Sequence, residues 1–269
     1  ELGQGIYVHW EKNRARREKM PAALCIGGVP AISYVAAQKL NYDVDEFAVA
    51  GGLVKAPIRV VKAKTVPLMV PADAEIIIEG WVNTEWLEPE APFGESHGHV
   101  NPKEYNPYMD VTAITRRKKA ILCSIISQVT PSESSVIKKM AYEPLYLDHL
   151  KNVLGVKSVI RVMLHEPLTA TQKLTVIQMR TPSQAEVWRA LMGAVAFRPS
   201  MSKIVIAVDE DIDPENLDAV FWALGYRSQP HRDVQIIRGT DVGHAPRHDA
   251  RGSADDSCLL WDATLKETF

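Results

Sequence analysis

Two glutamates, Glu90 and Glu95, flank a short Ala-Pro-Phe-Gly turn, and this spacing could support acid–base chemistry. Pro92 restricts the backbone and Gly94 relieves it, so the turn should have a defined shape. Two carboxylates held in one pocket cannot ionise independently, and one of them can stay an acid while the other stays an anion. The same residues also fit a solvated acidic loop, because further glutamates precede them. From spacing alone, both interpretations stay open.

The elements that must position these acids follow from hydrophobic periodicity and turn signals. The first half should hold helices at 30–40 and 43–53 and strands at 5–9, 22–26, 58–64, 74–82, 111–116 and 120–127. From residue 131 helices alternate with strands: helices at 132–154 (opening with a cap-like TPSE), 183–196 and 214–224, and strands at 156–164, 174–179 and 203–208. The pattern predicts an α+β protein with two domains, 1–130 and 131–269, the second an α/β domain.

Composition narrows the class of function. The chain has 269 residues, 46% of them hydrophobic, and a formal net charge of −2, which argues against binding to nucleic acid or a membrane surface. Its apolar runs are short and interrupted, so we expect no membrane span and no signal peptide. Cys25, Cys123 and Cys258 have no close spacing, which favours a reducing, cytoplasmic location and three buried thiols rather than a metal cluster.

Several segments resemble UbiD-like decarboxylases. The signature stretch reads VPADAEIIIEG, EAPFGE and SHGHV, and DEFAVAGGLVKAPIRVVKAKT precedes it. VTAITRRKKAIL, TPSE, KIVIAVDEDIDPENLDAVFWAL and WDAT follow in the order of the family. The resemblance spans nearly the whole chain and implies a split β-barrel that holds prenylated FMN, followed by a C-terminal α/β domain. Members of the family are usually longer, so we expect this chain to lack an N-terminal part.

The resemblance also implies roles for single residues. Glu95 would donate a proton to the substrate carbon, and Glu90 would orient a triad arginine that lies outside this chain. Glu46 would ligate a divalent metal such as Mn²⁺ at the cofactor phosphate, where many members also hold K⁺. The alternative for Glu46 is an acidic residue at a helix N-terminus, which the helix dipole favours.

Contacts of two further kinds are implied. Contacts to the flavin or its phosphate would come from His9, Trp10 and Arg14. The substrate pocket would be shaped by Ser96, Glu133 and Ile137. Cys258 stands where family members commonly carry a lysine near the flavin, and a thiol cannot supply that charge. Two histidine groups are expected not to bind metal: His97 and His99 in a turn, and His244 and His248, with Asp241 and Asp249 nearby.

The implied function is that of a carboxy-lyase. The reaction would be reversible, non-oxidative decarboxylation of an aromatic, heteroaromatic or α,β-unsaturated carboxylic acid, with release of CO₂. A flavin prenyltransferase would supply the cofactor, and the protein would form a homo-oligomer between a dimer and a hexamer. One alternative is a non-catalytic subunit or scaffold of a larger decarboxylase complex, which would show no flavin absorbance. The other is an FMN-binding oxidoreductase, which would be reduced by a nicotinamide and would leave Glu90 and Glu95 unexplained.

Overall fold

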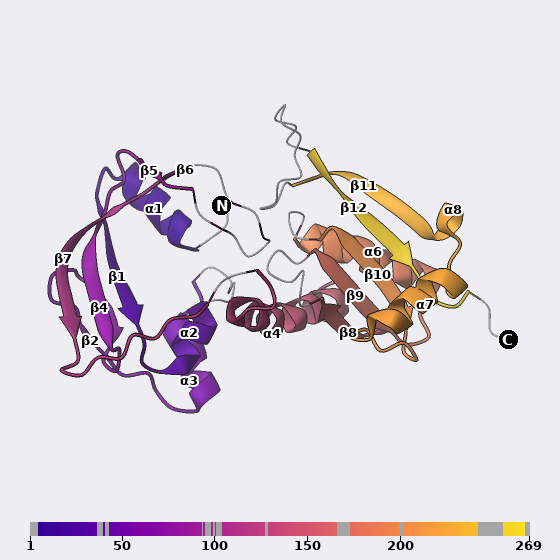
Figure 1. The fold of residues 1–269 in the computed structure, drawn as a ribbon, viewed down its shortest axis with the longest axis horizontal. Helices are drawn as coiled ribbons and strands as arrows, with labels where there is room; N and C mark the ends of the chain where they lie inside the picture. The colour runs from indigo at the N-terminus through magenta and orange to yellow at the C-terminus, as the bar shows by residue number, and fades with distance from the viewer. Residues whose placement is uncertain are drawn as a thin grey trace. The chain divides into compact units, whose positions relative to one another are not determined.

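The computed structural model describes residues 5–36, 40, 43–92, 94, 98, 100, 104–126, 129–165, 173–198, 202–241 and 255–266. The chain divides into two compact units, Glu1–Phe93 with Val100–Ile125 and Gly94–His99 with Ile126–Phe269. Both units mix helices and strands, which confirms the predicted α+β class (Figure 1). Within these described ranges, every helix is too short or too polar to cross a bilayer.

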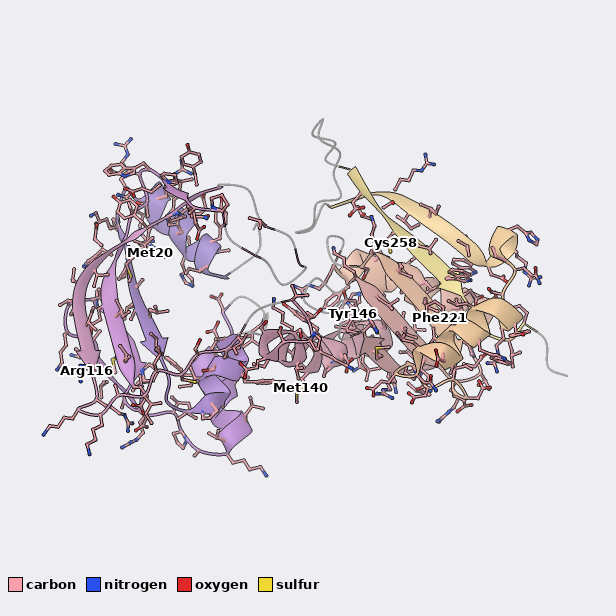
Figure 2. The ribbon with its side chains drawn as sticks, viewed as in Figure 1. Met20, Arg116, Met140, Tyr146, Phe221 and Cys258 are labelled. Atoms are coloured by element: carbon pink, nitrogen blue, oxygen red, sulfur yellow. The ribbon has the colours of Figure 1, made fainter. Side chains whose placement is uncertain are left out.

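The first unit is built on a three-stranded antiparallel sheet of order β1–β4–β7. Its strands are β1 (Met20–Ile26), β4 (Ile76–Val82) and β7 (Met109–Arg116). Figure 2 labels Met20 and Arg116 at opposite ends of this sheet, as the antiparallel register requires. Two short ladders join β2 (Val60–Lys62) to β3 (Met69–Pro71), and β5 (Glu88–Glu90) to β6 (Glu104–Asn106). The helices are α1 (Gly5–Ala15), α2 (Pro30–Ala36) and α3 (Glu46–Val54). Closure into a split barrel stays a prediction.

The Glu-Gly pair at the centre of β4 is explained by crowding against β7. The ladder between the two strands is irregular between Glu79 and Gly80. A Cβ atom at Gly80 would overlap the carbonyl oxygen of Asp110 and would lie 2.7 Å from the Cγ atom of Met109. Only glycine therefore lets β7 approach at this point, and β7 is the strand that leads back from the segment after the paired acids.

The neighbouring Glu79 is a buried carboxylate with several hydrogen-bond donors. Its side chain is 1% exposed. It accepts hydrogen bonds from the backbone N–H groups of Lys64 (2.8 Å) and Thr65 (2.6 Å) and from the Thr65 hydroxyl (2.8 Å). The backbone N–H of Lys64, helped by the donors of Thr65, lowers the pKa of Glu79, although burial acts in the opposite direction. The carboxylate thus ties the connection between β2 and β3 to the central strand.

We expect Glu79→Gln to lower the free energy of unfolding by about 2–4 kcal/mol, because the new amide NH₂ would face N–H donors. The folded pKa of Glu79 lies below its unfolded value. Its stabilisation is therefore complete above the unfolded pKa and is lost as pH falls through the folded pKa. Urea unfolding across this acidic window should show a steeper loss for the wild type than for Glu79→Gln. The exposed Glu85→Gln is the control, and equal acid sensitivity of all three proteins would contradict the prediction.

The second unit is a five-stranded sheet of order β11–β12–β10–β9–β8. The central strands β9 (Leu174–Met179), β10 (Ile204–Asp209) and β12 (Asp255–Asp262) are parallel, while the edge strands β8 (Val159–Leu164) and β11 (Val234–Asp241) are antiparallel. One core contains residues of α4 (Glu133–Asp148), the π-helical turn η1 (His149–Val153) and α6 (Gln184–Phe197). The other contains residues of α7 (Leu217–Arg227). A short α8 (Pro230–Asp233) precedes β11.

Alternate residues of β10 show how the helices cover both faces of this sheet. Val205 and Ala207 belong to the core of α4 and α6, whereas Ile206 and Val208 belong to the core of α7. The strand is therefore apolar on both faces, as its continuous hydrophobic run predicted. The predicted cap of the long helix is also present, since the Ser132 side chain accepts a hydrogen bond from Ser135 at the helix N-terminus.

Two predicted strands are wrong in kind, and the elements predicted from 43, 156 and 214 each begin three residues later than expected. Residues 5–9 begin helix α1 rather than forming a strand, because Trp10 and Asn13 then bury one helix face together. Residues 120–126 are irregular rather than a strand, and the N–H of Ile121 donates to the Glu75 carboxylate at 3.2 Å. The helix predicted from 214 begins three residues later, where the Asn216 side chain accepts a hydrogen bond from the backbone of α7.

Candidate active site

Glu90 is the last residue of β5 and is exposed. Its register partner is Glu104 in β6. Its carboxylate oxygen Oε2 accepts a hydrogen bond from the side-chain amide of Asn106, two residues further along β6. One oxygen of the carboxylate is therefore held by an uncharged donor, while Oε1 accepts no hydrogen bond from the part of the chain that the structure describes and can accept from a cationic partner.

A buried asparagine, Asn83, fixes the point where the chain leaves β4 towards Glu90. Its side chain is 2% exposed. Its backbone N–H donates to the carbonyl of Tyr108 and its side-chain amide donates to the Tyr108 hydroxyl, each at 3.0 Å. Its side-chain oxygen accepts from the N–H groups of Glu85 (2.8 Å) and Trp86 (3.2 Å), and its carbonyl accepts from the Trp10 indole at 2.8 Å. The hairpin that carries Glu90 thus starts from a fixed base.

Helix α1 carries the residues predicted to contact the cofactor. Trp10 is 6% exposed, and the guanidinium of Arg14 lies over its ring at 5.1 Å. His9 is exposed on the same helix. Because the Trp10 indole N–H is bonded to Asn83, this tryptophan supports the base of the acidic hairpin. Contact of His9, Trp10 and Arg14 with a flavin stays a prediction.

Glu46 is the first residue of α3 and is exposed. The preceding Asp45 caps the helix, accepting hydrogen bonds from Phe47 N–H (2.9 Å) and Ala48 N–H (3.4 Å). The oxygen donors of Glu46 suit a hard divalent cation, and the helix dipole favours the same carboxylate. Among the described residues, no three His, Cys, Asp or Glu side chains form a group that could hold a metal. A metal at Glu46 therefore stays a prediction and needs further ligands.

Of the predicted substrate residues, the structure describes Glu133 and Ile137, whereas Ser96 lies outside the described ranges. Glu133 and Ile137 lie one turn apart at the start of α4 in the second unit. The Glu133 carboxylate accepts the N–H of Ile126 at 2.7 Å, and Ile137 is half-buried. Four predicted site or turn residues lie outside the described ranges: Glu95, Ser96, His97 and His99.

The structure adds a cluster that sequence reasoning missed, at the end of α6. Arg198 caps the helix C-terminus and its guanidinium lies over the ring of Tyr142 at 4.3 Å. Its Nη1 atom is buried without a hydrogen-bond acceptor among the residues that the structure describes, where Arg198 also forms no ion pair. The hydroxyls of Tyr146 (0% exposed) and Ser202 (4% exposed) lie close together, and neither completes a hydrogen bond of good geometry there.

This Arg198 cluster, made of Arg198, Tyr146 and Ser202, fits an oxyanion. Burial raises the pKa of Tyr146 to about 12, so its hydroxyl stays a neutral donor at physiological pH. A buried guanidinium nitrogen without an acceptor is costly, and a phosphate or carboxylate oxygen is the kind of group that would satisfy it. Figure 2 labels Tyr146 on α4, within the second unit. A single arginine after a helix resembles a solvated C-terminal residue in sequence, so only its buried neighbours could reveal this cluster.

The cysteines are only partly as predicted. Cys258 is fully buried in the core of the second unit, and burial raises the pKa of its thiol to about 12 (Figure 2). It is therefore an inert small hydrophobe that cannot present charge to a ligand. Cys25 is half-buried, and Cys123 is exposed, which corrects the expectation that all three are buried. Of the second histidine group, His244, His248 and Asp249 lie outside the described ranges.

Comparison with known proteins gives the family of the chain. Residues 2–129 match the 3-octaprenyl-4-hydroxybenzoate carboxy-lyase Rift-related domain of the UbiD family. Residues 135–263 match the C-terminal domain of the same carboxy-lyase. A protein of unassigned function from Aquifex aeolicus is 34% identical over 97% of this chain, and one from Archaeoglobus fulgidus is 31% identical over 87%. The chain spans about half the length of these relatives, 53% and 50%.

Solved structures show the same likeness over the whole chain. The UbiD-class enzyme HmfF from Pelotomaculum thermopropionicum, in complex with FMN, is 27% identical with a TM-score of 0.87, over 98% of this chain and 58% of its own. An evolved dimeric form of HmfF with prFMN gives a TM-score of 0.85 at 27% identity, over 100% and 58%. Apo 3,4-dihydroxybenzoic acid decarboxylase from Klebsiella pneumoniae gives 0.82 at 25% identity, over 98% and 58%. The chain therefore belongs to the UbiD family, whose Rift-related and C-terminal domains it carries in that order.

Proposed function

We propose that this chain forms the reactive part of a prenylated-FMN-dependent decarboxylase that acts on an aromatic, heteroaromatic or α,β-unsaturated carboxylic acid. The observation that carries the proposal is the likeness, over nearly the whole chain, to a UbiD-class enzyme solved with FMN. Prenylated FMN, when bound, supplies the electron sink for the pair that remains on the substrate carbon when CO₂ leaves. The chain itself must bind, orient and deliver a proton.

Glu90 and Glu95 divide these tasks. Glu90 holds an arginine from outside residues 1–269 through its open carboxylate oxygen, and the arginine orients the substrate carboxylate. When the bond from carbon to the carboxylate breaks, CO₂ departs. Glu95 then gives its proton to the same carbon and is reprotonated by solvent. In the reverse direction Glu95 removes that proton as a base. The hydrogen bonds of Asn83 support the role of Glu90, because they fix the start of the hairpin that carries it. A general acid or its partner must be held within hydrogen-bond reach of the reacting atom.

Charge on the cofactor and substrate requires cationic groups. Glu46 would hold a divalent cation such as Mn²⁺ at the cofactor phosphate, with K⁺ as a second cation. His9 and Arg14 would lie near the flavin, and Ser96, Glu133 and Ile137 near the substrate. A flavin prenyltransferase would supply the cofactor, and the enzyme would assemble from two to six copies.

One experiment tests the proposal against both alternatives. The full-length protein is co-expressed with a flavin prenyltransferase, and the bound cofactor is identified by its absorbance spectrum and mass. CO₂ release is then measured with 3,4-dihydroxybenzoate, vanillate, furan-2-carboxylate and cinnamate. We expect a bound prenylated flavin and CO₂ release from at least one acid. A protein without flavin would favour a scaffold, and a flavin reduced by a nicotinamide without CO₂ release would favour an oxidoreductase.

A further inference from the structure

We propose that Asn106 is a positioning residue for Glu90. Its side-chain amide donates to Oε2 of the Glu90 carboxylate and fixes the direction in which Oε1 is presented. This inference rests on the proposed function for its effect on turnover. The contact itself is a property of the folded chain and is tested without any reaction.

The register of the hairpin shows that the contact is a diagonal one. Asn106 lies opposite Glu88 in the ladder, yet its amide donates to Glu90, at the end of the strand. Glu88 and Glu90 are alternate residues of β5, so both lie on the face of the ladder where Asn106 lies. Two carboxylates on one face repel each other. The Asn106 amide donates to Glu90 and not to Glu88, so it fixes the side-chain direction of Glu90 alone. Among the residues that the structure describes, no side chain donates a comparable hydrogen bond to Glu88.

Asn106 can hold Glu90 in place because its own backbone is anchored. It is half-buried, whereas Glu90 is exposed. Pro107 restricts the backbone immediately after it, and Tyr108 then binds Asn83 through both its carbonyl and its hydroxyl. Asn83 is bonded in turn to the Trp10 indole. A continuous set of bonded residues therefore leads from the buried part of the first unit to an exposed carboxylate.

Loss of this donor should affect how well Glu90 is aligned rather than whether the protein folds. An exposed glutamate on a three-residue strand samples several rotamers, and one hydrogen bond to a charged group selects among them. We expect Asn106→Leu, which keeps the size of the side chain and removes the donor, to lower kcat by about tenfold. Asn106→Gln keeps an amide donor and should recover part of this loss.

The test uses the full-length protein and two readouts. The first is the ¹⁵N–¹H signal of the Asn106 side-chain amide, assigned by its loss in Asn106→Leu. It should shift in Glu90→Gln and stay in place in Glu88→Gln, the matched control on the same strand. The second readout is kcat and its pH profile for Asn106→Leu, Asn106→Gln and Glu88→Gln, with the acid that the wild type decarboxylates best. Glu88→Gln should keep wild-type kcat and thermal stability.

The outcomes separate the inference from the proposed function. An amide signal that ignores Glu90→Gln overturns the inference, whatever the activity. A signal that responds, with unchanged kcat in Asn106→Leu, also overturns it, because the contact then has no effect on the reaction. A responding signal in a wild type that decarboxylates none of the acids rejects the proposed function while the positioning contact stands. A responding signal with a lower kcat that Asn106→Gln restores supports both.

Discussion

Glu95→Gln should stop turnover of the full-length protein while folding and cofactor content stay intact. Glutamine has nearly the size of glutamate but cannot donate a proton to carbon. The substrate carbon would then keep its unprotonated state after CO₂ leaves, and product release would fail. Removal of a positioned general acid costs about 10²–10⁴-fold in rate. The measurement is CO₂ release in single-turnover and steady-state assays, with flavin absorbance to confirm cofactor content.

The control for this experiment is Glu85→Gln, which removes an exposed carboxylate from the same segment of the chain. It should turn over at the wild-type rate. A second check is exchange of the product C–H hydrogen with deuterated solvent, which requires the same acid in the reverse direction and should disappear in Glu95→Gln. Decarboxylation at an undiminished rate in Glu95→Gln would remove Glu95 from the mechanism and leave Glu90 as the remaining acid of the pair.

Glu46→Ala should lose the divalent metal and, with it, most of the flavin. The cofactor phosphate would then lack its bridging cation, and a ligand that binds only the folded state would no longer stabilise it. We expect occupancy of metal and flavin to fall at least tenfold in the purified protein. Metal analysis by mass spectrometry, flavin absorbance and the ligand-dependent rise in Tm are the three measurements.

If Glu46 is only a carboxylate that the helix dipole favours, its substitution should affect stability and not metal content. Asp218→Ala is the matched control, since Asp218 is an exposed acid in the first turn of α7. If both residues act through the dipole, each substitution should cost about 0.3–1 kcal/mol of stability and leave metal content alone. Stoichiometric metal and flavin in Glu46→Ala would therefore reject the metal role and retain the dipole explanation.

The secondary structure of this chain is largely predictable where local patterns are strong. The strand around Ile76–Val82 has a β-branched apolar run, and the helix after Ser132 has its cap. The exception at residues 5–9 is instructive. Ile6, Tyr7 and Val8 favour a strand by propensity, yet the segment is helical because Trp10 and Asn13 then bury one face and the indole reaches Asn83. Tertiary contact overrides propensity in such short apolar runs.

The second unit shows a related limit. The strands Val234–Asp241 and Asp255–Asp262 were not predicted, although each has eight residues. Mixed polar and apolar residues give these segments a weak period. Their order in the sheet places β12 beside β10, so the last strand in the chain is inserted next to a central one. Local sequence carries no information on such a crossover, because it depends on which strand edges remain open once the core has formed.

The sequence by itself predicted the α+β class from its periodicity, and its motifs, through their resemblance to UbiD-like decarboxylases, gave the family and the candidate acids. The spacing of Glu90 and Glu95 around a Pro-Gly turn and the acid at the start of α3 are short-range features, readable without coordinates. Only the tertiary structure decided which groups hold them. The Asn106 amide reaches Glu90 across 16 positions, and the Trp10 indole reaches Asn83 across 73. The Arg198 guanidinium at the end of α6 lies over the ring of Tyr142, which another helix supplies. Hydrogen bonds and burial act over a few ångströms in space, whereas sequence patterns describe neighbours along the chain, so such partners are visible only once the fold has brought them together.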